Sequence, residues 1–235
     1  WPVTRRFHRP STAVFASTQR LCDELSYRGI GNGRLWSRGI DTRLFYSDGP
    51  VDERIARLPG PVMLTVGQVA TEKNLDAFLG CSAPGTKVVV GDGPALTALK
   101  RRYPQVVFLG ALAGEALASV YRAADVFVFP SLTDTFGLVM IEALACGVPV
   151  AAFPVPGPLD IIGSGGRGPD AALAQRIGMT DDDLPTAIQG ALKSSRRASS
   201  IYGASFCWSR CTDQFEAGLI DAIHATSGVR RAASF

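Results

Sequence analysis

Short apolar runs alternate with amphipathic segments from residue 60 onward. The runs are nearly continuous in apolar residues, as in strands that are buried on both faces of a parallel sheet; they cover residues 62–66, 87–90, 106–109, 126–129 and 148–153. Apolar residues recur at three and four positions in the intervening segments, which predicts helices over residues 74–79, 94–102, 115–123 and 136–145. This alternation predicts an α/β fold with a Rossmann-like, doubly wound parallel sheet, in which ligands bind at the carboxyl ends of the strands.

The remaining segments suggest how the chain is divided. Residues 30–59 are rich in glycine and lack a strand period, so we interpret them as an interdomain connection. A strand at 13–16 and a helix at 18–27 make residues 1–29 the expected end of a preceding domain. Residues 60–204 would form the ligand-binding domain, including a loop at 163–169, and residues 205–235 a terminal helix, predicted over 209–225, with a tail. Because the chain starts at Trp1 without Met, we interpret it as part of a longer protein.

Composition excludes several functions. The 24 basic and 21 acidic residues give a net charge of only +3, which gives no reason to expect a nucleic-acid partner. The five cysteines are odd in number and lack the paired spacing of a zinc site, so reduced thiols and a cytoplasmic location are expected. The most apolar stretch is interrupted by Glu142, Pro149 and Pro154, which excludes a membrane-spanning segment there.

The candidate chemistry follows the strand at 126–129. Asp134 lies in the next loop, and Glu142 follows it on a helix after seven intervening residues. Free N–H groups near Thr135 to Leu138 would form an anion site suited to a diphosphate, and carboxylates bind vicinal hydroxyls. The ordinary alternative is that Asp134 caps the helix and Glu142 faces solvent. The apolar neighbours of Glu142 argue against that alternative, because burying an unpartnered carboxylate is costly.

This stretch resembles the E-x7-E signature of retaining GT-B glycosyltransferases of family 4. The similarity extends to the loop from Val66 to Asn74, to the Gly91-Asp92-Gly93-Pro94 turn and to Phe108-Leu109-Gly110, so that it covers residues 61–162 in order. Residues 38–45 resemble the interdomain connection of the family, and residues 7–25 the end of its N-terminal domain. The resemblance therefore implies the C-terminal, donor-binding lobe of a GT-B fold.

The resemblance also implies a set of site residues. Lys73, Asp134 and Glu142 would carry the chemistry, and the other donor-binding residues would be Gly67, Gln68, Gly91, Leu112, Thr135, Phe136, Gly137 and Leu138. Glu142 would hold the ribose diol, and Lys73 would neutralise the leaving diphosphate. Asp134 and the amides of Phe136 and Gly137 would hold the sugar and phosphates. No metal and no cofactor are expected besides a GDP- or UDP-linked sugar donor.

Two residues depart from the family pattern. Asp134 replaces the usual Glu and can make the same hydrogen bonds from a carboxylate one methylene shorter. Gln68 stands where the family usually carries Arg, which removes a fixed cation beside the diphosphate.

The function implied by the resemblance is transfer of a mannose- or glucose-type hexose with retention at the anomeric carbon. The chain alone is expected to bind donor only. A lipid or glycan acceptor, and peripheral contact with the inner face of a membrane through the missing lobe, stay open. Two alternatives also stay open: a nucleotide-sugar epimerase of GT-B architecture and a nucleotide-binding module that transfers nothing.

Overall fold

The computed structural model describes residues 1–232 of the chain. These residues form two compact units. Unit 1 combines the N-terminal segment, up to Gly39, with the C-terminal segment from Phe206, and unit 2 is the continuous stretch from Ile40 to Ser205. The two units are described separately below.

Unit 2 is built on a six-stranded sheet of order β5-β4-β3-β6-β7-β8 in which every neighbouring pair is parallel. The strands are β3 (Val62–Val66), β4 (Thr86–Val90), β5 (Val107–Gly110), β6 (Val126–Phe129), β7 (Val150–Ala152) and β8 (Gly178–Thr180). The chain runs outward from β3 to β5, returns to β6 beside β3, and continues outward to β8. The strand order therefore reverses between β3 and β6, and the predicted doubly wound parallel sheet is confirmed.

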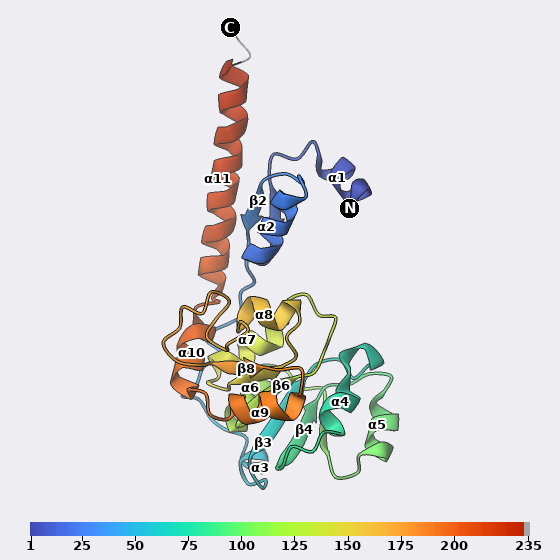
Figure 1. Cartoon of the computed structure of the whole chain (residues 1–235). Helices are drawn as coiled ribbons and strands as arrows, with labels where there is room; N and C mark the ends of the chain where they lie inside the picture. Colours follow the sequence, from blue (N-terminus) through green and yellow to red (C-terminus); the bar gives the residue numbers. More distant parts are fainter. Residues whose placement is uncertain (233–235) are drawn as a thin grey trace. The chain divides into compact units, whose positions relative to one another are not determined.

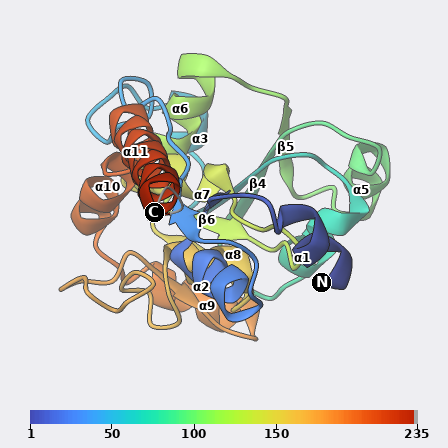
Figure 2. The ribbon, with the colours of Figure 1, turned by 90° about the horizontal axis from the view of Figure 1, so that it is seen from above.

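Helices connect successive strands of this sheet (Figure 1): α4 (Leu75–Leu79), α5 (Leu96–Arg102), α6 (Gly114–Ala123), α7 (Leu138–Ala145) and α8 (Pro156–Ile161), with a 3-10 turn at Thr71–Lys73 before α4. Helix α3 (Glu53–Ala56) precedes β3, and α9 (Leu184–Ala191) and α10 (Arg196–Ala204) follow β8. Figure 2 shows α6 and α9 on opposite sides of β6, as expected of a sheet that is covered on both faces.

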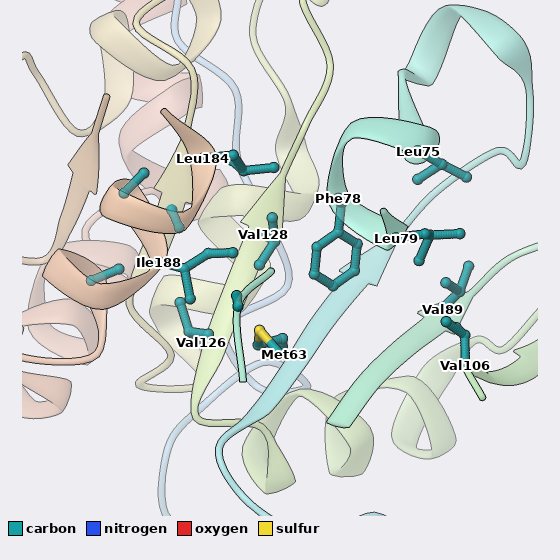
Figure 3. Close-up of a cluster of buried hydrophobic side chains, with 14 of the residues drawn as sticks. Met63, Leu75, Phe78, Leu79, Val89, Val106, Val126, Val128, Leu184 and Ile188 are labelled. Atoms are coloured by element: carbon teal, nitrogen blue, oxygen red, sulfur yellow. The ribbon is translucent and has the colours of Figure 1, made fainter. Parts of the chain in front are cut away.

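The core is divided between the two faces of the sheet. On one face, Val126 and Val128 of β6 pack with Phe78 of α4 and Ile188 of α9 (Figure 3). On the other face, Phe127 contacts the ring of Tyr121 on α6, with ring centroids 5.8 Å apart. Because side chains alternate along a strand, the apolar run in β6 supplies both halves of the core and fixes the strand between its covering helices.

Unit 1 contains a smaller sheet. Its elements are α1 (Pro2–His8), β1 (Val14–Ala16), α2 (Gln19–Tyr27), β2 (Gly33–Leu35) and α11 (Trp208–Ala232). Strands β1 and β2 are parallel, and α2 starts at an N-cap, where the hydroxyl of Thr18 accepts a hydrogen bond from the Leu21 N–H. Phe215 of α11 packs against Phe15 and Trp36, with ring centroids 5.0 Å apart in both pairs.

Several sequence predictions differ from the structure. Residues 30–59 lack a strand period in the sequence, yet they contain β2, which pairs with β1, and helix α3. Strand β7 is only Val150–Ala152, shorter than the predicted 148–153, and α11 begins one residue before the predicted terminal helix and runs beyond its end. Helices α8 to α10 and strand β8 were not predicted. Both β2 and β8 have three residues and begin at glycine, so neither presents an apolar run.

The start of α7 also differs from the prediction. The helix was expected from Phe136, but it begins at Leu138, because Gly137 is its N-cap and adopts a left-handed conformation with φ +85°. Phe136 is buried in the preceding loop instead. The first free N–H groups of this helix therefore belong to residues from Leu138 onward, and Thr135 and Phe136 lie in the loop rather than in the helix.

Candidate functional site

The candidate site lies where the strand order reverses, at the carboxyl ends of β3 and β6. In doubly wound sheets the connections from such neighbouring strands leave in opposite directions and open a crevice for ligands. The loop after β3 carries Lys73 and Asn74, and the loop after β6 carries Asp134. The side-chain amide of Asn74 donates a hydrogen bond of 3.0 Å to the carbonyl of Pro130. The two loops are thus tied together at this point.

Lys73 and Asp134 form an ion pair between these two loops. Lys73 Nζ lies 2.6 Å from Asp134 Oδ1, and the two side chains are 29% and 24% exposed. Asp134 Oδ2 is buried and has no hydrogen-bond partner among the described residues. Asp134 does not cap α7, which has no side-chain cap. The ordinary interpretation of this residue as a helix cap is therefore wrong.

Glu142 lies on the second turn of α7 and faces α6. Its Oε2 accepts a hydrogen bond of 3.0 Å from the hydroxyl of Tyr121, which is fully buried. Burial raises the pKa of Glu142, while the hydrogen bond from Tyr121 acts in the opposite direction. Burial also raises the pKa of Tyr121 well above its ordinary value, so that the hydroxyl keeps its proton and donates. The interpretation of Glu142 as a solvated surface residue is thus wrong.

Glycines bring the ends of β3, β4 and β5 together. The N–H of Gly67 donates to the carbonyl of Val90, and the N–H of Gly91 donates to the carbonyl of Gly110, at 3.0 and 2.8 Å. A Cβ atom on Gly91 would lie 1.8 Å from the carbonyl oxygen of Gly67, so no larger residue fits without movement of the backbone. Glycine at position 91 thus permits a close approach of the two backbones at the ends of β3 and β4.

The other predicted site residues lie in the same series of loops. Gln68 is exposed directly after Gly67, Leu112 is half-buried after β5, and Thr135 is exposed between Asp134 and α7. Leu138, the first residue of α7, is 42% exposed. Of the three residues predicted to carry the chemistry, the structure joins Lys73 directly to Asp134 and pairs Glu142 with Tyr121. The roles of these residues toward a donor stay predictions.

Sequence reasoning missed Tyr121 and Asn74. Tyr121 lies within the helix predicted at residues 115–123, where it follows the apolar periodicity. Its hydroxyl was the available signal, because a buried hydroxyl requires a partner. Asn74 adopts a left-handed conformation, with φ +53°, between the 3-10 turn and α4. No pattern in the sequence indicated its contact with Pro130.

Among the residues that the structure describes, no group of three or more His, Cys, Asp or Glu side chains is arranged to hold a metal ion. None of the helices described is both long enough and apolar enough to span a bilayer.

The family is decided by comparison with known proteins. The sequence pattern of the glycosyl transferases group 1 matches residues 60–192, more than half of the chain. The chain belongs to this family. Within this group of glycosyltransferases, it is 31% identical to a GDP-mannose-dependent alpha-mannosyltransferase from Corynebacterium glutamicum over 87% of its length. It is 33% identical to a protein of the same name from Mycobacterium tuberculosis over 80% of its length.

Comparison with solved structures confirms that this glycosyltransferase chain has the fold of GT-B enzymes. A sucrose-phosphate synthase from Thermosynechococcus elongatus superposes with a TM-score of 0.75 at 24% identity, and the match covers 95% of this chain and 61% of the synthase chain. The Anabaena protein Alr3699/HepE, in complex with UDP, superposes with a TM-score of 0.69 at 20% identity and covers 93% and 66% of the two chains.

The chain spans half the length of the two mannosyltransferases that it resembles. The matched residues 60–192 lie entirely within unit 2, which also contains every residue of the candidate site.

Proposed function

We propose that the protein containing this chain transfers a hexose from a nucleoside diphosphate sugar to an acceptor, with retention at the anomeric carbon, and that unit 2 binds the donor. The observation that carries the proposal is the Lys73–Asp134 ion pair between the loops after β3 and β6. A cation and a carboxylate at the switch point of a parallel sheet suit the two polar parts of such a donor, its diphosphate and its sugar hydroxyls.

Each charged group has a role that its surroundings permit. Lys73 Nζ has three donors, so it can keep one hydrogen bond to Asp134 and direct another at a phosphate oxygen. Asp134 Oδ2, buried and without a partner among the described residues, can accept a hydrogen bond from a sugar hydroxyl. Glu142 uses Oε2 for Tyr121 and can offer Oε1 to a ribose diol. Stabilising charge on a departing diphosphate is a large term in such reactions, and here Lys73 would supply it.

The proposed donor is GDP-mannose. Three relatives that share 31 to 34% identity with this chain are named GDP-mannose-dependent alpha-mannosyltransferases. UDP-sugars are the competing donors, because the similar Anabaena protein is in complex with UDP. Gln68 lies in the loop after β3 and leaves Lys73 as the cation proposed to meet the phosphates.

Calorimetry with GDP-mannose, GDP, UDP-glucose and ADP-glucose tests donor binding. We expect the guanosine compounds to bind most tightly and Glu142→Ala to weaken GDP binding by roughly tenfold, as for a lost hydrogen bond to a charged group. Asp76→Ala is the matched control, because Asp76 is an exposed acid on α4. Equal binding of GDP by the parent and the Glu142→Ala variant would refute the ribose assignment.

Incubation of the donor without acceptor separates the proposed activity from that of an epimerase. A transferase leaves the donor intact or hydrolyses it slowly, whereas an epimerase converts its sugar. If none of the four compounds binds, the donor proposal itself is wrong; if all four bind equally, the preference for GDP-mannose is wrong.

A further inference from the structure

Tyr121 is placed so that it contacts both the core of unit 2 and the candidate donor site. Its ring packs edge-on against Phe45 and at a tilt against Phe127, with ring centroids 6.0 and 5.8 Å away. Only its hydroxyl reaches a polar group, Oε2 of Glu142, at 3.0 Å. The two aromatic neighbours thus hold the ring of the fully buried Tyr121 in one orientation, and this orientation determines where its hydroxyl, a hydrogen-bond donor, lies.

Glu142 needs such a donor. It is the first polar side chain of α7, and the residues beside it, Ile141 and Ala143, are fully buried. A glutamate side chain has three rotatable bonds, so a carboxylate that meets a ligand with one oxygen benefits when the other oxygen is held. We infer that Tyr121 is a positioning residue of the donor site, and that its hydroxyl holds the carboxylate of Glu142 in the orientation that binds the ribose of the donor.

This inference rests on the proposed function, because it assigns Tyr121 to the site through Glu142. Tyr121 itself need not touch the nucleotide. A tyrosine that only fills the core would serve equally well without its hydroxyl, so Tyr121→Phe separates the two roles while keeping the ring and its packing.

The hydrogen bond also bears on ionisation. Burial raises the pKa of Glu142 and the hydroxyl of Tyr121 opposes this rise, so loss of the hydroxyl raises the pKa further. Cys146, the C-cap residue of α7, interacts electrostatically with Glu142, and burial raises the pKa of its thiol to about 12. Arg122 and Glu115 of α6 and Arg196 of α10 also interact electrostatically with Cys146. Tyr121 and Cys146 keep their protons at neutral pH, so Glu142 is the one of these three groups that gains a proton as the pH falls.

The test is the affinity of GDP, measured by calorimetry between pH 5 and 8, for the parent and the Tyr121→Phe, Glu142→Gln and doubly substituted variants. We expect Tyr121→Phe to bind GDP roughly tenfold more weakly at pH 7. Its affinity should also begin to fall at a higher pH than that of the parent. The ionisation of the terminal phosphate of GDP affects all variants alike, so Glu142→Gln and the double variant should share one pH profile. The double variant should bind no more weakly than Glu142→Gln alone.

Tyr103→Phe is the matched control. The hydroxyl of Tyr103 donates a similar hydrogen bond, 2.9 Å long, to the exposed carboxylate of Asp76. Its loss should leave both the affinity and its pH profile unchanged.

The outcomes separate the two proposals. If Glu142→Gln weakens GDP binding but Tyr121→Phe matches the parent at every pH, the positioning role is refuted and the donor site stands. If Glu142→Gln binds GDP as the parent does, the ribose assignment itself fails. Should Tyr121→Phe not fold, the parent protein labelled with fluorotyrosine replaces it. One 19F signal should then follow the ionisation of Glu142 in the parent and cease to titrate in Glu142→Gln. If no 19F signal titrates in this way, the contact between Tyr121 and Glu142 is refuted.

Discussion

At the residue scale, the proposed role of Glu142 conflicts with the stability of its surroundings. An ionised carboxylate is the better acceptor for ribose hydroxyls, but burial favours its protonated form and raises its pKa. One hydrogen bond from Tyr121 offsets only part of this cost. Polar groups that are kept in such positions at the expense of stability are typical of functional sites.

Glu142→Gln should therefore stabilise the protein at neutral pH. Because the pKa of Glu142 is raised on folding, its contribution to the free energy of unfolding is greatest below its ordinary pKa and decreases as the pH rises through the raised value. The amide keeps an oxygen for Tyr121 and does not titrate. The gain in unfolding free energy over the parent should therefore increase as the pH rises above about 4.5 and then level off. Its final size should be about 1.4 kcal/mol for each unit by which folding raises the pKa of Glu142.

Urea denaturation at a series of pH values, followed by circular dichroism, measures this difference. Glu72→Gln, at an exposed position of the 3-10 turn, is the control. A gain for Glu142→Gln that stays constant from pH 4 to 8 would contradict the assignment of the effect to ionisation.

At the scale of elements, the close approach of strand ends depends on Gly91. Its φ is +143°, and a Cβ atom there would collide with the carbonyl oxygen of Gly67. Gly67 also has a positive φ, +150°, but a Cβ atom there meets no other atom within 4 Å. Gly91→Ala should lower the unfolding free energy by about 2–4 kcal/mol, and Gly67→Ala by about 1 kcal/mol, since the second variant has backbone strain without the collision.

The midpoints and slopes of urea denaturation for the two alanine variants check this order. Equal losses in both would mean that the backbone conformation, and not the contact between the two loops, makes glycine necessary at position 91.

The sequence predicted those elements that have a long enough pattern. Strands β3 to β6 are largely apolar segments of four or five residues, and each was placed to within one residue at either end. Strand β2 begins with glycine and contains Arg34, so it is defined by pairing with β1 rather than by its own residues. Pairing between distant segments is a tertiary effect that no local pattern carries.

The candidate site was predictable to a similar extent. The spacing of Asp134 and Glu142 and the loop after each strand follow from the sequence, because a parallel sheet brings the carboxyl ends of its strands to one edge. The partners of these two acids do not follow from the sequence. The pairing of Lys73 with Asp134 depends on the course of two loops, and that of Tyr121 with Glu142 on how α6 lies against α7.

At the scale of the whole molecule, donor binding and the rest of the proposed reaction are separable. Unit 2 is one uninterrupted stretch with its own sheet and core, and it contains Lys73, Asp134 and Glu142. Unit 1 joins two distant segments of the chain, and its small sheet has two strands. Because a domain with its own hydrophobic core can fold alone, the donor site should not require unit 1.

Residues 40–205, produced alone, should therefore fold and bind GDP with an affinity within about threefold of that of the whole chain, a difference of less than 1 kcal/mol. All three tryptophans, Trp1, Trp36 and Trp208, lie outside this stretch, so calorimetry must replace tryptophan fluorescence as the measurement. Glu142→Gln in the same fragment is the control and should weaken binding as it does in the whole chain. A fragment that shows a cooperative unfolding transition but binds GDP more than tenfold more weakly would place part of the donor site in unit 1.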